Sequence, residues 1–141
     1  MNRYPTRFVG MKCAFFAAFW ILLVFSAGCR TQDERLLEPT AAYDLMRSNQ
    51  GNPDFVILDV RTAGEFRQGY IEGAVLLDYH AVDFRERFAK LDRNATILMY
   101  CRSGNRSSHA LRMADELGFK RVYDLRGGIL AWKEAGLSLV R

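Results

Sequence analysis

The sequence has few of the residues that staple a small protein together or bind a metal in it. Only three cysteines and two histidines occur among its 141 residues. The three cysteines fall in different parts of the chain, so no disulfide framework is predicted. His80 and His109 have no second ligand at a metal-binding spacing, and neither a metal site nor another cofactor is predicted.

Internal repeats, low-complexity tracts and a concentrated charge of one sign are also missing. The whole chain carries a net charge of +4, with 20 basic and 16 acidic residues. Three of the basic residues, Arg3, Arg7 and Lys12, precede a long apolar run, and without them 17 basic residues face 16 acidic ones, a net charge of +1. Nucleic-acid binding needs a concentrated basic face, so a nucleic-acid partner is not predicted.

The apolar run, from Cys13 to Gly28, follows those basic residues and ends in small residues. This layout is typical of a secretory signal. The run is shorter than the roughly 20 residues of a membrane-spanning helix, which favours a signal at 1–28 over an uncleaved anchor. The segment 29–38 is then a polar tether, with room for a short strand at Leu36 and Leu37.

The residues Ser26, Ala27 and Gly28 lead directly into Cys29, which resembles a lipobox with Ser26 where leucine is usual. The resemblance implies a lipid on Cys29, a membrane partner, and a location in a bacterial cell envelope facing the periplasm or the exterior. An ordinary signal peptidase cutting at the same bond is the alternative.

Apolar runs without a regular in–out alternation predict strands buried on both faces, at 55–60, 74–79, 96–100 and 121–125. Helical segments alternate with them, at 40–48 with Thr40 as cap, from the Thr62–Glu65 capping box, and at 82–90, 105–117 and 129–135. This order predicts one α/β domain over 39–141, with three layers and a central, mostly parallel sheet flanked by helices.

The candidate chemistry lies where the strand at 96–100 runs into Cys101, a polar loop and a helix. Ligands of open α/β sheets bind at the carboxyl ends of strands. A loop that curls into a helix N-terminus directs backbone N–H groups and partial positive charge inward. A cysteine there has a lowered pKa. Gly104 permits the turn, and Arg102 and Arg106 are predicted to be mobile cations that attract an anionic donor.

The segment Cys101 to Ser107 resembles the active-site loop of rhodanese-like sulfurtransferases. Two further stretches resemble the family in the right order: Leu58-Asp59-Val60-Arg61 with 65–66 and 69–74, and Leu125-Arg126-Gly127-Gly128 with Trp132 and Gly136. Tyr70 stands where the family often has histidine. The resemblance implies the rhodanese-like three-layer fold for nearly all of the chain from Pro39 onward.

The resemblance also implies the roles of the loop residues. Cys101 becomes the nucleophile that forms a persulfide, and the transferred sulfur is bound by Arg102, Ser103, Gly104, Asn105, Arg106 and Ser107. Asp59, Arg61 and Glu65 support the loop, unless they serve only as charge pairs of a neighbouring helix. The implied partners are a small anionic donor such as thiosulfate and a thiol or other sulfur acceptor.

Three alternatives stay open. Cysteine phosphatases and arsenate reductases use a similar loop with one more residue between cysteine and arginine, whereas four residues separate Cys101 from Arg106. A non-catalytic, membrane-tethered binding module of the same family is the second alternative, although such modules typically replace the cysteine. In the third, Cys101 is an ordinary buried cysteine at a strand end.

Overall fold

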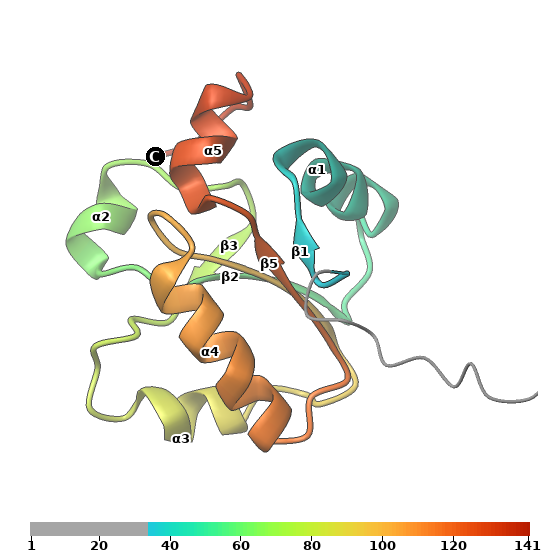
Figure 1. Cartoon of the computed structure of the whole chain (residues 1–141), viewed down its shortest axis with the longest axis vertical. Helices are drawn as coiled ribbons and strands as arrows, with labels where there is room; N and C mark the ends of the chain where they lie inside the picture. The colour runs from blue at the N-terminus through green and yellow to red at the C-terminus, as the bar shows by residue number, and fades with distance from the viewer. Residues whose placement is uncertain (1–33) are drawn as a thin grey trace, which may run out of the picture.

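A parallel sheet organises the part of the chain that the computed structural model describes, residues 34–141 (Figure 1). The strands lie in the order β1-β5-β4-β2-β3, and every neighbouring pair is parallel. Their bounds are β1 (Leu36–Leu37), β2 (Phe55–Asp59), β3 (Ala74–Leu76), β4 (Thr96–Tyr100) and β5 (Arg121–Leu125). The predicted parallel sheet is therefore confirmed.

Helices cover both faces of the sheet, as Figure 1 shows. Their bounds are α1 (Pro39–Ser48), α2 (Ala63–Arg67), α3 (Phe84–Ala89), α4 (Asn105–Glu116) and α5 (Gly128–Glu134). Apolar residues of α3 and α4 pack in one core cluster, and those of α1 and α5 pack in the other. The three-layer α/β architecture predicted from the sequence is confirmed.

The central strand β4 explains why the core has two halves. Ile97 and Met99 pack in the cluster with α3 and α4, whereas Leu98 and Tyr100 pack in the cluster with α1 and α5. All four are fully buried, because both faces of the strand are covered. Burying a side chain of this size contributes about 1.5–3 kcal/mol. The strand is thus firmly held, and so is the residue that follows it, Cys101.

Two local predictions were wrong. Thr40 does not cap α1, since Pro39 takes the first helical position and Glu38 precedes it without a side-chain cap. Proline fits that position because it has no N–H to satisfy there. The predicted strand 74–79 ends at Leu76, whose partner Asp59 is the last residue of β2.

The predicted signal at 1–28, the candidate lipidation site Cys29 and the first part of the tether lie outside the described residues. The last part of the tether belongs to the domain. The Arg35 guanidinium pairs with Asp115 of α4 at 2.5 Å, and β1 pairs with β5. Within 34–141, none of the helices has the length and apolar character needed to cross a membrane.

Candidate active site

Cys101 lies at the carboxyl end of β4, in the middle of the sheet, and its side chain is buried. A short loop leads from it to α4, whose cap is Gly104 with a φ of 96°. That left-handed conformation favours glycine over residues with a Cβ. The turn brings the first residues of α4 back over the sulfur.

Several donors surround the Cys101 sulfur. The Gly104 N–H donates to Sγ at 3.2 Å, and the Ser107 hydroxyl lies 3.5 Å from Sγ. Burial alone raises the pKa of the thiol, but hydrogen bonds from the Ser107 side chain and from the N–H groups of Ser107, Ser103 and Gly104 outweigh it. The pKa of Cys101 is therefore lowered, as predicted from the loop and the helix N-terminus.

These donors make a small anion site around one sulfur atom. Ser103 and Gly104 belong to the stretch predicted to supply backbone N–H groups, and Ser107 adds one more. Arg102, Ser103 and Asn105 have exposed side chains, so they line the outside of the loop. The inner surface can stabilise negative charge on Cys101 or on an atom bound to it.

Arg106 is not the mobile cation predicted from the sequence. Its guanidinium donates two hydrogen bonds to Glu65, at 2.8 and 2.7 Å. The bond from Arg106 lowers the pKa of Glu65 to about 2, although burial opposes it. The fork of Arg106 and the carboxylate of Glu65 thus fasten α4 to the segment that carries α2. Negative charge on Cys101 also raises the pKa of Arg106, so the positive charge of Arg106 still acts on the site.

Glu65 has both roles that the sequence left open. Its carboxylate accepts from the Thr62 N–H at 3.0 Å, and its own N–H donates to Thr62 Oγ1, which completes the predicted capping box of α2. The same carboxylate binds Arg106. Glu65 therefore supports a helix and holds the loop in place through Arg106.

Asp59 and Arg61 form a buried ion pair at the end of β2. The Arg61 guanidinium lies 2.6 Å from the Asp59 carboxylate and donates to the Gly69 carbonyl at 2.8 Å. It also sits over the Tyr100 ring, 5.5 Å from its centroid. Because Gly69 follows α2, this pair ties both ends of the α2 segment to the sheet. Asp59 and Arg61 thus position the segment that carries Glu65.

The start of α5 packs against the loop and holds it by hydrogen bonds, a role that sequence reasoning missed. The Ile129 and Leu130 N–H groups donate to the Cys101 and Arg102 carbonyls, at 2.9 and 3.2 Å. A Cβ on Gly128 would lie 2.5 Å from the Cys101 carbonyl oxygen. The Gly127-Gly128 pair was the available signal, because adjacent glycines after a strand mark a close backbone approach.

Tyr70, which replaces the usual histidine, stacks on Phe66 with ring centroids 4.0 Å apart. Its backbone pairs with Val140. His109 interacts with Arg112 on α4. His80 packs edge-on against Tyr79, with ring centroids 5.6 Å apart.

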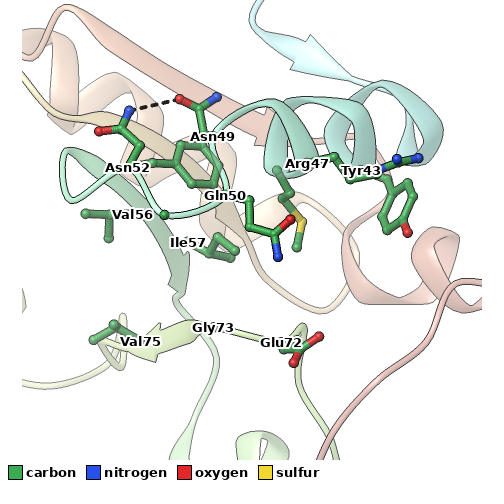
Figure 2. Close-up of a pocket in the computed structure, with 13 residues that line it drawn as sticks. Tyr43, Arg47, Asn49, Gln50, Asn52, Val56, Ile57, Glu72, Gly73 and Val75 are labelled. Atoms are coloured by element: carbon green, nitrogen blue, oxygen red, sulfur yellow. Dashed lines mark hydrogen bonds between the residues drawn. The ribbon is translucent and has the colours of Figure 1, made fainter.

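A cavity of about 500 Å³ lies elsewhere, beside α1 and the starts of β2 and β3 (Figure 2). Parallel strands place their amino ends at the edge opposite Cys101. Its lining holds the side chains of Tyr43, Arg47, Asn49 and Glu72 but neither cysteine nor histidine. The assignment of the site therefore rests on Cys101 and not on the size of this cavity.

Comparison with known proteins agrees with this geometry. The profile of the Rhodanese-like domain matches residues 41–135. The chain belongs to the rhodanese-like domain family. The family match includes Cys101, the loop, and the supporting residues Asp59, Arg61 and Glu65.

Relatives of this rhodanese-like domain include sulfurtransferases. A sulfurtransferase from Allochromatium vinosum is 38% identical over 87 residues, covering 62% of this chain and 79% of the relative. A tRNA uridine(34) hydroxylase from Chlamydia caviae is 32% identical over 111 residues, but the match covers only 32% of that protein and 74% of this chain. The same domain thus occurs in proteins with other chemistry.

Solved structures show the same fold. A rhodanese-related protein from Thermoplasma volcanium has a TM-score of 0.65 and 27% identity, over 75% of this chain and 97% of that protein. Family and fold therefore agree with the architecture built from the sequence.

Proposed function

We propose that this protein is a sulfurtransferase that carries sulfur as a persulfide on Cys101, with thiosulfate as a model donor. The observation that carries the proposal is the set of N–H and O–H donors around Sγ, at the N-terminus of α4. Such donors stabilise the thiolate before the reaction and the negative terminal sulfur after it. The sulfurtransferase relative supports the same class of reaction.

In the first half-reaction the Cys101 thiolate attacks the outer sulfur of thiosulfate. A bond forms between Sγ and that sulfur, and the sulfur–sulfur bond of thiosulfate breaks. Sulfite leaves with the electron pair, so no oxidant or reductant is consumed. The product is Cys101–S–S⁻, and its charge lies where the loop donors converge.

In the second half-reaction an acceptor nucleophile attacks the terminal sulfur. The bond between Sγ and that sulfur breaks, and the thiolate of Cys101 leaves with the electron pair. Two covalent half-reactions of this kind give ping-pong kinetics. Of the two arginines in the loop, Arg106 is held by Glu65 and Arg102 is exposed, so Arg102 is the one proposed to attract an anionic donor.

A phosphatase needs an arginine that grips the phosphate oxygens. Here both guanidinium branches of Arg106 bind Glu65, and four residues separate Arg106 from Cys101. A small loop whose arginine is already bound to Glu65 suits one sulfur atom better than a phosphate group. The intact nucleophile also favours an enzyme over a non-catalytic binding module.

The test is a mass measurement on the full chain with Cys13 and Cys29 replaced by serine, so that Cys101 is the only thiol. Incubation with thiosulfate is expected to add the mass of one sulfur atom, and cyanide is expected to remove it. The additional substitution Cys101→Ser is the matched control and is expected to gain nothing. A folded, reduced protein that gains no sulfur would refute the proposal and make a phosphate ester the next substrate to try.

The location of the protein is a separate proposal: export to the cell envelope and attachment through a lipid on Cys29. The basic residues, the apolar run and the small residues before Cys29 support it. In a bacterial host, radiolabelled fatty acid is expected to label the full chain and not its Cys29→Ser variant. Absence of label from both proteins, with the chain expressed, would contradict lipidation.

A further inference from the structure

A buried acid on β5 takes no part in the reaction described so far. Asp124 is 1% exposed, and its Oδ1 has no hydrogen-bond partner among residues 34–141. Burial raises the pKa of Asp124 to about 7, although the Ser107 hydroxyl and the Leu125 N–H oppose the rise. A carboxyl group in such surroundings holds its proton at pH values where an exposed aspartate has lost it.

The charged groups around Asp124 form ion pairs or hydrogen bonds with other residues, or are exposed. Its register partners are Leu36 in β1 and Met99 in β4, and neither strand carries a charged side chain. Tyr100, at the end of β4, packs on the opposite face of the sheet. The charged and titratable groups of α4, the helix on this face, have partners of their own: Arg106 with Glu65, Asp115 with Arg35, Glu116 with Arg85, and Arg112 with His109. Two residues along the chain from Asp124, Arg126 pairs with Glu38. On α5, which packs on the face with Tyr100, Lys133 and Glu134 are exposed.

Ser107 links Asp124 to the reactive sulfur. Asp124 comes two residues after Val122, which packs against α4, so its side chain lies on the face of β5 that α4 covers, where Ser107 is buried. The Ser107 hydroxyl lowers the pKa of Asp124 and lies 3.5 Å from Cys101 Sγ. It also lies 3.2 Å from the Gly104 carbonyl oxygen. A hydroxyl has one proton to donate, so these three acceptors compete for it. The protonation state of Asp124 decides the competition.

When Asp124 is protonated, its O–H can donate to Ser107 Oγ, and the Ser107 proton is available to the sulfur. When Asp124 is ionised, its carboxylate accepts the Ser107 proton. The sulfur then loses a donor and gains a negative neighbour in a buried region. Both effects disfavour a thiolate or persulfide on Cys101.

We propose that Asp124 is a positioning residue that, while protonated, directs the Ser107 hydroxyl to the Cys101 sulfur and so stabilises negative charge there. The inference rests on the proposed function only in taking Cys101 as the reactive thiol. It needs neither a particular donor nor an acceptor. Because the two groups interact, they titrate as a pair, and ionisation of Asp124 makes ionisation of Cys101 harder.

The experiment follows the rate of Cys101 alkylation by iodoacetamide against pH, in the full chain with Cys13 and Cys29 replaced by serine. The substitution Asp124→Asn keeps the shape of the side chain, removes its charge and offers an N–H donor to Ser107 at every pH. The midpoint of the alkylation profile is expected to move to lower pH in Asp124→Asn. Asp44→Asn is the matched control, since Asp44 is exposed on α1, and its midpoint is expected to stay in place.

A double-mutant cycle with Ser107→Ala tests the route of the coupling. Ser107→Ala is expected to raise the midpoint, and Asp124→Asn is expected to shift it less in the Ser107→Ala background. An unchanged midpoint in a folded Asp124→Asn protein would overturn the proposal. Equal shifts with and without Ser107 would overturn it too, because the effect would not pass through the hydroxyl.

A second measurement does not depend on any change at Asp124. Carbon-13 NMR of the Asp124 carboxyl gives its titration directly, and coupling between two sites is reciprocal. The midpoint of Asp124 is expected to fall in Cys101→Ala, because the thiolate is gone; an unchanged midpoint would overturn the proposal. Neither assay contains a sulfur donor, so failure of persulfide formation and failure of this coupling are distinguishable.

Discussion

Gly128→Ala is the substitution that probes most directly how the fold holds the reactive loop. Gly128 has a φ of 60°, and a Cβ on it would lie 2.5 Å from the Cys101 carbonyl oxygen. The same Cβ would lie 2.7 Å from the carbonyl carbon and the oxygen of Arg102. These neighbours are backbone atoms, so no side-chain rotation relieves the overlap. The loop, the start of α5 or both have to move.

Two terms set the expected cost. An L-residue in the left-handed region costs about 1–2 kcal/mol. Overpacking a closely packed site adds about 1–3 kcal/mol. The free energy of unfolding is therefore expected to fall by about 2–5 kcal/mol, a large share of the roughly 5–15 kcal/mol typical of a domain.

Gly136→Ala is the matched control for the first term. Gly136 has a φ of 74°, and no heavy atom lies within 4 Å of the position that an added Cβ would take. It is expected to cost about 1–2 kcal/mol, from backbone conformation alone. Urea unfolding followed by circular dichroism measures both variants. Iodoacetamide alkylation of Cys101 is expected to change in Gly128→Ala and not in Gly136→Ala. Equal losses of stability would refute the contact between Gly128 and the loop.

The remaining predictions concern the pair of Glu65 and Arg106. Glu65→Gln is expected to lower the free energy of unfolding at neutral pH by about 1–2 kcal/mol, because a partly exposed charge-assisted pair is lost; an unchanged urea midpoint would contradict this. The pKa of Glu65 is about 2 in the folded protein and ordinarily 4.5, so the folded state favours the charged form. Its contribution is complete above the ordinary pKa and is lost as the pH falls toward 2. The stability difference between the native chain and Glu65→Gln is therefore expected to shrink over that range, and a difference that grows in acid would contradict the assignment.

The sequence by itself determined the features that depend on local patterns. Continuous apolar runs predicted the parallel sheet, since both faces of β4 had to be covered. The Thr62–Glu65 spacing predicted the cap of α2, because its two hydrogen bonds join residues one helical turn apart. The cysteine before a glycine-containing loop and a helix predicted the anion site. Each signal lies within a few consecutive residues.

The tertiary structure decided the features that join distant parts of the chain. Arg106 donates to Glu65, 41 positions away in the sequence. This bond fixes a side chain that the sequence predicted to be mobile. Gly128 lies against the Cys101 carbonyl because the start of α5 packs on the loop. Asp124 becomes a buried acid next to Ser107 only when β5 lies between β1 and β4, under α4. Local sequence patterns do not identify these partners. The effect of burial on the pKa of Asp124 depends on the elements that surround it in the folded protein.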